Sequence, residues 1–492
     1  MNQHLEQLEP TSVWRHFRTL CNIPRPSFYE AQLRDLLFNW AQSKGLEAYI
    51  DPCGNLLIRK PASKGMENRE TVVLQGHLDM VAQKNEGVEH DFTKDPIKTE
   101  IIDGWVTAKQ TTLGADNGIG VAAALAVLEA TDIAHGPIEA LFTIEEESSL
   151  RGAAELQEEL LTGRLLFNLD SEDRGDVYIG CAGGIDINIQ HSYATQTVSD
   201  DQVGYELSVS GLRGGHSGLD IHKGRASATV LLVRLLSALN EQCIFQLSSL
   251  KGGTLRNAIA REAKAILSIA PDQISAIKSC VKVLKDEIID EFDIVENEIK
   301  INLKPCQKVS KVLRDVDKQV LVETLKCAPH GVEKISVDLP NVTETSCNFG
   351  VVNLELEKEG FEFSACFLVR SLIDLDATNL ASKIKTHFEK ISAQVFLEND
   401  YPGWQPDANS NLLSYFLDTH KDVMGYDANV KVIHAGLECG IIGAKYKNME
   451  MVSFGPNIRG AHSPDERLEI DSVADFWRLL VRLLANIPVR CV

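Results

Sequence analysis

The stretch Val72-Val73-Leu74-Gln75-Gly76-His77-Leu78-Asp79 decides which fold this sequence predicts, because an apolar strand-like run ends in side chains that bind metals well. Similar endings recur along the chain. Residues 141–144 lead into Glu145-Glu146-Glu147, residues 165–169 stop at Asp170, Asp116 lies in the turn 113–118, and residues 451–454 precede Gly455-Pro456 and His462. Ligands of open α/β sheets bind beyond the carboxyl ends of the strands, so these endings can converge on one crevice. The sequence therefore predicts an α/β protein with a dinuclear metal site.

The composition predicts a globular protein of several domains and argues against a nucleic-acid partner. The chain has 492 residues, of which 44% are hydrophobic and 24% charged, and single cores stop growing near roughly 250–300 residues. We therefore expect at least two domains. The net charge of −21 argues against binding to nucleic acid or to an anionic membrane, since both require a basic face.

The cysteines and the N-terminus favour the cytoplasm. Eleven cysteines form an odd set without a Cys-x-x-Cys pair, which is typical of reduced thiols in a cytosolic protein. Residues 1–10 are polar and acidic, and no apolar run approaches the ~18–20 residues that span a bilayer. We expect a cytoplasmic protein without a membrane partner.

Hydrophobic periodicity divides the chain into three segments. Helical spacing at 29–43 and 117–131 alternates with short strands at 55–58 and 71–75, which favours an α/β layer. The pattern then changes, with strands predicted at 204–210, 350–356 and 361–369 and helices at 226–240, 273–290 and 377–391. Strand–helix alternation resumes after Tyr401. We predict a catalytic domain made of residues 1–186 and 399–492, with residues 187–398 inserted as a second domain.

The residues at the strand ends suit a pair of divalent ions. Imidazole nitrogen and carboxylate oxygen are ligands of zinc, and manganese or cobalt tolerates the same mixture. The candidate ligands are His77, Asp116, Glu147, Asp170 and His462. Their three carboxylates oppose the four positive charges of two ions, and Asp116, central in the series, is the candidate for a shared ligand. Glu146 could act as the base that takes a proton from the attacking water, and Asp79 could hydrogen-bond the second nitrogen of His77.

Each signal has an ordinary alternative when taken alone. His77 could be a packed histidine, Asp170 a helix-capping acid, and the glutamate triplet a solvated face. Glycines 114, 118 and 120 could suggest a phosphate loop, but their spacing matches neither dinucleotide nor Walker motifs, and Asp116 would repel a phosphate. The order of the whole set makes the metal-site interpretation specific.

A series of motifs spread over essentially the whole chain resembles the co-catalytic zinc exopeptidases related to aminoacylase and glutamate carboxypeptidase. The motifs occupy residues 74–80, 112–120, 181–186, 214–218, 252–259, 401–407, 434–440 and 462–466. Within that family the chain is similar to cytosolic dipeptidases that cleave carnosine-like substrates. The resemblance implies an α/β/α catalytic domain with an inserted α+β lid of doubled ferredoxin-like fold.

The resemblance also implies roles for individual residues. One ion would take His77, Asp116 and Asp170, and the other would take Asp116, Glu147 and His462. Glu146 matches the catalytic base, and Asp79 matches an aspartate counted with it as catalytic.

Four further residues correspond to substrate contacts: His216, Asn257, Arg370 and Glu438. His216 resembles a lid histidine that donates to the developing oxyanion. Arg370, with help from Asn257, could clamp the terminal carboxylate of a dipeptide, and Glu438 could receive its free amino group. The ordinary alternatives are a turn histidine for His216 and surface salt bridges for Arg370 and Glu438.

The implied function is hydrolysis of dipeptides with a free amino terminus, including Xaa-His dipeptides such as β-alanyl-histidine, by a water that two metal ions activate. A homodimer is expected, although a doubled lid also permits a monomer. The family usually has a small residue and a glycine after its glutamate pair, where this chain has Ser148-Ser149. Aligning Gly152 with the family's glycine selects Glu146 and Glu147 over Glu145 and Glu146. Two alternatives stay open, an N-acyl amino acid deacylase and a non-catalytic relative that binds metal or partners.

Overall fold

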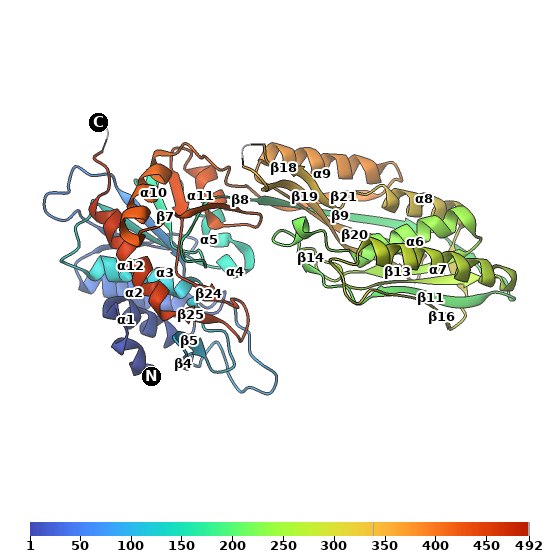
Figure 1. Ribbon diagram of the computed structural model, residues 1–492, viewed down its shortest axis with the longest axis horizontal. Helices are drawn as coiled ribbons and strands as arrows, with labels where there is room; N and C mark the ends of the chain where they lie inside the picture. Colours follow the sequence, from blue (N-terminus) through green and yellow to red (C-terminus); the bar gives the residue numbers. More distant parts are fainter. Residues whose placement is uncertain (338, 491–492) are drawn as a thin grey trace. The chain divides into compact units, whose positions relative to one another are not determined.

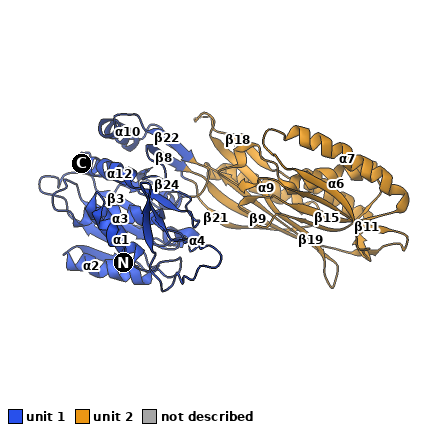
Figure 2. Ribbon diagram, turned by 60° about the horizontal axis from the view of Figure 1, so that its bottom comes forward, with its two compact units in different colours: residues 1–180, 404–432, 437–492 blue, residues 181–403, 433–436 orange. Residues whose placement is uncertain are grey.

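The computed structural model describes residues 1–337 and 339–490, which form two compact units. Unit 1 comprises residues 1–180, 404–432 and 437–492, and unit 2 comprises residues 181–403 and 433–436 (Figure 2). The chain passes from unit 1 into unit 2 near residue 181 and returns to unit 1 near residue 403. The predicted boundaries were 187 and 398. They differ because β9 (Gly183–Tyr193) and β21 (Gln394–Tyr401) belong to the sheet of unit 2. The division into a catalytic domain and an inserted lid domain stays a prediction.

Unit 1 is built on an eight-stranded sheet in the order β1-β2-β6-β3-β7-β23-β8-β22. Figure 1 labels β7 and β8 of this sheet. Its strands are β1 (Glu47–Ile50), β2 (Leu56–Lys60), β3 (Val72–His77), β6 (Ile138–Thr143), β7 (Leu165–Asn168), β8 (Asp176–Cys181), β22 (Asn429–Ile433) and β23 (Glu450–Ser453). The neighbours β6, β3, β7 and β23 run parallel. Every residue of β3, β6 and β7 is buried, as expected for parallel strands covered on both faces.

Helices and a small second sheet complete unit 1. The helices are α1 (Thr11–Cys21), α2 (Ala31–Ser43), α3 (Ala115–Glu129), α4 (Glu146–Ser149), α5 (Arg151–Ala154), α10 (Asn411–Met424), α11 (Glu438–Lys445) and α12 (Ile470–Ala485). The second sheet has the order β24-β25-β5-β4, formed by β24 (Ile458–Arg459), β25 (Arg467–Glu469), β5 (Trp105–Ala108) and β4 (Thr99–Ile102).

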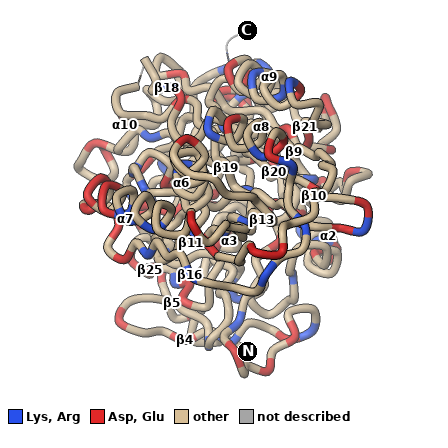
Figure 3. The backbone as a smooth tube through the Cα atoms, turned by 90° about the vertical axis from the view of Figure 1, so that its right-hand side faces the viewer, with Lys and Arg blue, Asp and Glu red and all other residues tan. Residues whose placement is uncertain are grey.

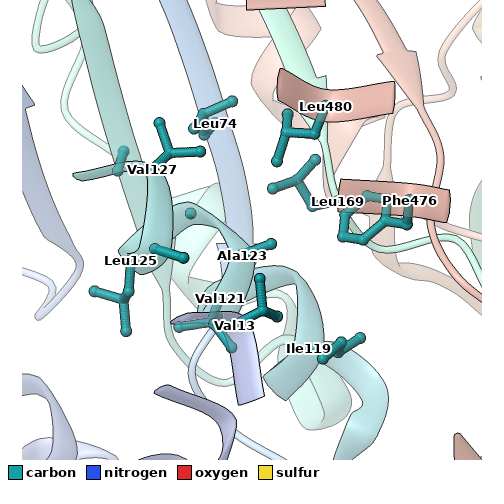
Figure 4. Close-up of a cluster of buried hydrophobic side chains, with 14 of the residues drawn as sticks. Val13, Leu74, Ile119, Val121, Ala123, Leu125, Val127, Leu169, Phe476 and Leu480 are labelled. Atoms are coloured by element: carbon teal, nitrogen blue, oxygen red, sulfur yellow. The ribbon is translucent and has the colours of Figure 1, made fainter. Parts of the chain in front are cut away.

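The core of unit 1 gathers around α3, whose small apolar side chains let it pack closely on the sheet. Figure 4 shows residues of α3 beside side chains from α1, β3 and α12; the labelled ones are Val13, Leu74, Ile119, Val121, Ala123, Leu125, Val127, Leu169, Phe476 and Leu480. At Gly120 an added Cβ would lie 2.2 Å from the carbonyl oxygen of Leu169. Close packing against the end of β7, rather than phosphate binding, therefore explains this glycine.

Unit 2 contains one large antiparallel sheet in the order β16-β11-β15-β13-β19-β20-β9-β21, with β18 paired to β19. Its remaining strands are β10 (Thr195–Thr197), β11 (Val203–Ser210), β12 (Gly215–His216), β13 (Gln246–Gly252), β14 (Ala258–Ile259), β15 (Ala263–Ile269), β16 (Lys300–Cys306), β17 (Lys311–Leu313), β18 (Gly331–Ile335), β19 (Thr343–Leu356) and β20 (Phe361–Ser371). Its helices are α6 (Ala228–Gln242), α7 (Ile274–Glu291), α8 (Asp315–Lys326) and α9 (Asp374–Glu389).

Two ferredoxin-like modules share this sheet, one nested in the other. The elements β11-α6-β13-β15-α7-β16 form a βαββαβ module with the spatial order β16-β11-β15-β13, which is the ferredoxin-like arrangement. The strands β9, β19, β20 and β21 repeat that order as β21-β9-β20-β19, with α9 between β20 and β21. The first module lies between β9 and β19 in the chain, which gives the expected doubled fold.

Among the described residues, no helix is long and apolar enough to cross a membrane, and no disulfide joins the cysteines. Cys491 lies outside the described residues. Acidic and basic residues are interspersed along the backbone in the view of Figure 3.

Candidate metal and substrate site

The carboxyl ends of four parallel strands bring the predicted ligands of unit 1 together. β3 ends at His77, β6 leads into the turn before α4, β7 leads to Asp170, and β23 precedes the segment that carries His462. Parallel strands end at the same edge of a sheet, so side chains separated by hundreds of residues meet there.

Asp116 lies between the two histidines. Its Oδ1 is 3.1 Å from Nε2 of His77, and its Oδ2 is 3.1 Å from Nε2 of His462. The Oε2 atom of Glu147 lies 2.9 Å from Nε2 of His462, and Oδ1 of Asp170 lies 3.5 Å from Nε2 of His77. One carboxylate thus faces two groups of ligand atoms, as a shared ligand requires.

Three overlapping groups of side chains could each hold a metal ion, with ligand atoms within 4.8 Å of one another. These groups are His77 with Asp116 and Asp170, His77 with Glu146 and Glu147, and Asp116 with Glu147 and His462. The first and third contain all five predicted ligands and share Asp116, whereas the second adds the predicted base Glu146.

The titratable groups of the cluster favour added positive charge. Burial opposes a charged His77 imidazole, but Asp170 and Asp116 outweigh it and raise its pKa well above the usual value. Hydrogen bonds to Asp116 and Glu147 raise the pKa of His462 to about 11. Burial raises the pKa of Asp170 to about 8 and that of Glu146 well above the usual value.

Two observations test whether divalent ions fit the site. Glu147 Oε1 and Asp170 Oδ1 are buried and accept no hydrogen bond from any residue that the structure describes. Buried carboxylate oxygens that accept no hydrogen bond are costly unless a cation binds them. The two imidazoles and three carboxylates are also a donor set suited to zinc, so the residues fit a pair of such ions.

Asp79 fixes both the first ligand and the glutamate turn. Its Oδ1 lies 3.3 Å from Nδ1 of His77, and its carboxylate accepts the backbone N–H groups of Glu146 and Glu147 at 3.0 and 3.1 Å. Ser27 Oγ donates to Oδ2 at 2.8 Å. The aspartate is fully buried, so it orients side chains rather than meeting solvent.

Glu145 belongs to none of the three groups of potential ligands. Its carboxylate pairs with Arg151 and accepts a hydrogen bond from Ser149 Oγ at 3.2 Å. Ser148 and Ser149, where the chain departs from the family's usual small residue and glycine, therefore lie in the turn that holds Glu145. This geometry favours Glu146 and Glu147 as the functional pair.

Glu438, the first residue of α11, is buried close to the same strands. Its Oε2 accepts hydrogen bonds from Gln75 Nε2 and Thr143 Oγ1, both at 2.6 Å. Its Oε1 is buried and lacks a hydrogen-bond partner among the residues described. Burial raises the pKa of Glu438 to about 7. Glu438 is therefore not a surface salt bridge, and its second oxygen is available to a cationic group.

Unit 2 brings His216, Asn257 and Arg370 together around Ser217. Arg370 Nε donates to Ser217 Oγ at 3.2 Å, and its Nη1 donates to Tyr401 Oη at 2.8 Å. The backbone carbonyl of Asn257 accepts Ser217 N–H at 2.8 Å, whereas the Asn257 side chain is exposed.

The hydrogen bonds of His216 define its tautomer. The N–H groups of Gly218 and Leu219 both donate to its Nδ1 at 3.1 Å, so Nδ1 carries no proton and Nε2–H is a donor. Burial, with the positive charge of Arg370, lowers the pKa of His216 to about 4. The imidazole is therefore neutral near pH 7.

Several residues of this neighbourhood escaped the sequence analysis. Gln75 and Thr143 hold Glu438, Arg25 and Glu466 bind the loops beside His77 and Asp116, and buried His434 lies 2.8 Å from Ser346 Oγ in unit 2. Gln75, His434 and Glu466 lie inside motifs that the sequence analysis quoted, so membership in a motif was the available signal. No local pattern marks the others.

Comparison with known proteins identifies the family. Residues 73–486 match the model of "Peptidase family M20/M25/M40". The chain is 42% identical over 486 residues to the cytosol non-specific dipeptidase of Escherichia coli, covering 99% of both chains. It matches the crystal structure of aminoacylhistidine dipeptidase from Vibrio alginolyticus with a TM-score of 0.91 and 41% identity, covering 100% of this chain and 99% of that one. Aminopeptidase PepT from Bacillus cereus shares the fold at 16% identity, with a TM-score of 0.57 and coverage of 98% and 99%.

These findings confirm the predicted family and the α/β fold with an inserted domain. By its sequence over nearly its full length and by its fold, the chain belongs to peptidase family M20/M25/M40.

Proposed function

We propose that this protein is a metal-dependent dipeptidase that cleaves dipeptides with a free amino terminus, including Xaa-His dipeptides such as β-alanyl-histidine. The convergence of five potential ligands and Glu146 at one sheet edge carries the proposal. The names of the Escherichia coli and Vibrio alginolyticus relatives, each about two-fifths identical over essentially the whole chain, support a dipeptide substrate.

Two divalent ions, zinc in our proposal and manganese or cobalt as alternatives, would occupy the site. His77, Asp116 and Asp170 would hold one ion, and Asp116, Glu147 and His462 would hold the other. Bound ions would supply Lewis-acid polarisation of the scissile carbonyl and a more acidic water.

Glu146 acts in this proposal as the base that accepts the proton of the attacking water and delivers it to the leaving nitrogen. Its raised pKa, caused first by burial, suits a group that must both take and return a proton. Asp79 supports this step by holding the backbone of Glu146 and Glu147.

His216 donates its Nε2–H to the oxygen that gains negative charge as the peptide bond is attacked. Its neutral state and fixed tautomer, both set by contacts within unit 2, are what that role requires.

The ends of the substrate meet opposite charges. In unit 1 the proposed partner of the substrate ammonium group is the buried oxygen Oε1 of Glu438. In unit 2 the proposed partner of the substrate carboxylate is the Arg370 guanidinium, with help from Asn257. An N-acyl amino acid deacylase would leave Glu438 unused, which argues for the dipeptidase. The hydroxyl groups of Ser148 and Ser149 donate to Glu145 rather than to Glu146 or Glu147, which argues against a non-catalytic relative.

We further propose a cytoplasmic homodimer, supported by the word cytosol in the name of the Escherichia coli relative and by the resemblance to dimeric dipeptidases. Light scattering of the purified protein would test the assembly, since a mass of one chain would reject the dimer.

The decisive experiment measures hydrolysis of β-alanyl-histidine and a panel of α-dipeptides before and after chelation, with zinc, manganese or cobalt restored singly. Metal-restored cleavage of dipeptides, but not of their acetylated analogues, is expected. Cleavage of acetylated substrates alone would assign the protein to the deacylases, and no cleavage with any metal would reject catalysis.

A further inference from the structure

One buried carboxylate outside the candidate ligands binds the loop that carries Asp116. Glu466 Oε2 accepts the backbone N–H groups of Leu113 and Gly114 at 2.7 and 2.9 Å, and its Oε1 accepts those of Ala115 and Asp116 at 2.7 and 3.2 Å. The residue is 2% exposed. The four hydrogen bonds from these backbone N–H groups to the carboxylate are charge-assisted. They therefore fix the backbone of residues 113–116 more firmly than contacts within the loop alone would.

Glu466 also belongs to the turn that carries His462. Only three residues separate the two, and Glu466 N–H donates to Ser463 O at 3.0 Å. Beyond it, β25 pairs with β5, and Thr107 Oγ1 donates to the carbonyl of Glu466 at 3.2 Å. The backbone of Glu466 is therefore anchored to the small sheet while its side chain holds the loop of Asp116.

Arg25 performs the complementary task on the other side of the same loop. Its Nη1 donates to the carbonyl oxygens of Leu78 and Asp79, both at 2.9 Å, and its Nη2 donates to Gly114 O. Gly114 has φ +71°, and an added Cβ there would lie 2.6 Å from Arg25 Nη2. Arg25 thus ties the loop after His77 to the loop before Asp116, and glycine is needed where they meet.

We infer that Glu466 is a positioning residue that holds Asp116 and His462 at the separation required for the metal site formed by Asp116, Glu147 and His462. The inference rests on the proposed function. Without Glu466 the loop of Asp116 would stay tied to His77 through Arg25, but it would lose its tie to the turn of His462. The ion held by His462 should therefore weaken more than the ion held by His77 and Asp170.

The test compares zinc binding by the full chain and its Glu466→Gln variant, using calorimetry against a competing chelator and metal analysis. An amide offers one acceptor oxygen to four N–H donors. The site of Asp116, Glu147 and His462 should therefore lose about 10–100-fold in affinity, while the site of His77, Asp116 and Asp170 changes less than about threefold. Asp465→Asn is the matched control, since it removes the same charge from an exposed neighbour and should change neither site. The visible spectrum of the cobalt-loaded Glu466→Gln protein should lose the contribution of the ion held by His462. The spectrum of Asp465→Asn should keep it.

A folded Glu466→Gln protein that binds both ions as the unaltered protein does, or that weakens both equally, would overturn the inference. If the variant fails to fold, hydrogen exchange in the metal-free unaltered protein decides. Slow exchange at the amides of residues 113–116 is expected, and rapid exchange at all four would overturn the inference. Failure of the unaltered protein to bind two zinc ions would instead count against the proposed function.

Discussion

Replacing Glu438 with glutamine should change which substrates the protein accepts without disturbing its fold. Glutamine has the same shape, and its carbonyl oxygen can still accept the bonds from Gln75 and Thr143 that Glu438 Oε2 accepts. The substitution removes the negative charge and places an NH₂ group where the unpartnered Oε1 lies. A substrate ammonium group would then face a donor instead of a carboxylate.

The size of the effect follows from the burial of this carboxylate, which is 1% exposed. Removing one partner of a buried, hydrogen-bonded charge pair costs about 2–5 kcal/mol, and each ~1.4 kcal/mol is a factor of ten. Thus kcat/KM for β-alanyl-histidine should fall by about 30- to 5,000-fold. Acetylated dipeptides carry no ammonium group, so their slow turnover, where measurable, should stay within about threefold.

The assay measures kcat/KM for free and acetylated forms of one dipeptide in both proteins. Glu139→Gln is the matched control because Glu139 is equally buried on β6, but its oxygens already accept hydrogen bonds from Arg59, Thr162 and Gly163. Glu139→Gln should lower the free energy of unfolding and leave unaltered the ratio of kcat/KM for the free dipeptide to kcat/KM for its acetylated form. An equal loss on both substrate forms in Glu438→Gln would refute amine recognition by Glu438.

Further predictions concern the metals, the base and pH. Glu146→Ala should keep the metal content and lower kcat by at least about 10²–10⁴-fold; metal analysis with steady-state kinetics tests this, and unchanged turnover would reject the base. His462→Ala should reduce bound metal toward one ion per chain, and retention of two ions would remove His462 from the ligands. Chelation should lower the thermal unfolding temperature because the carboxylates of the site lose their counter-charges, and calorimetry before and after zinc is restored should show the recovery; an unchanged temperature would argue against bound ions. Burial lowers the pKa of His16 to about 4 from an ordinary 6.5, so the unfolded chain takes up this proton first as the pH falls, and up to about 3 kcal/mol of stability should disappear between pH 6.5 and 4. Urea unfolding of the metal-free protein should show that the free energy of unfolding falls less between pH 6.5 and 4 in His16→Gln than in the unaltered protein. Equal dependence on pH in the two proteins would contradict the lowered pKa of His16.

Much of unit 1 could be predicted because its signals are local. The apolar runs at 72–74 and 165–169 coincide with β3 and β7, and the small-residue segment after Asp116 forms α3. Parallel strands place their ends at one edge, so the order of ligands along the chain was enough to predict that they meet. The same locality explains why six segments of unit 2 were predicted, namely β11, α6, α7, β19, β20 and α9. The strands β9, β13, β15 and β16, the helix α8 and the nesting of one ferredoxin-like module inside the other were not predicted.

The sequence by itself determined the family and several strand and helix segments of each unit, and it supplied the candidate metal ligands, since each depends on residue types at short or fixed spacing. Only the tertiary structure decided that Glu145 pairs with Arg151 while Glu146 and Glu147 face the site, that Glu438 keeps one unpartnered oxygen, and that Glu466 binds the loop of Asp116 some 350 residues earlier in the chain. These facts depend on hydrogen bonds between distant segments. Such bonds form only after the hydrophobic core has brought those segments together, and no local pattern encodes their geometry.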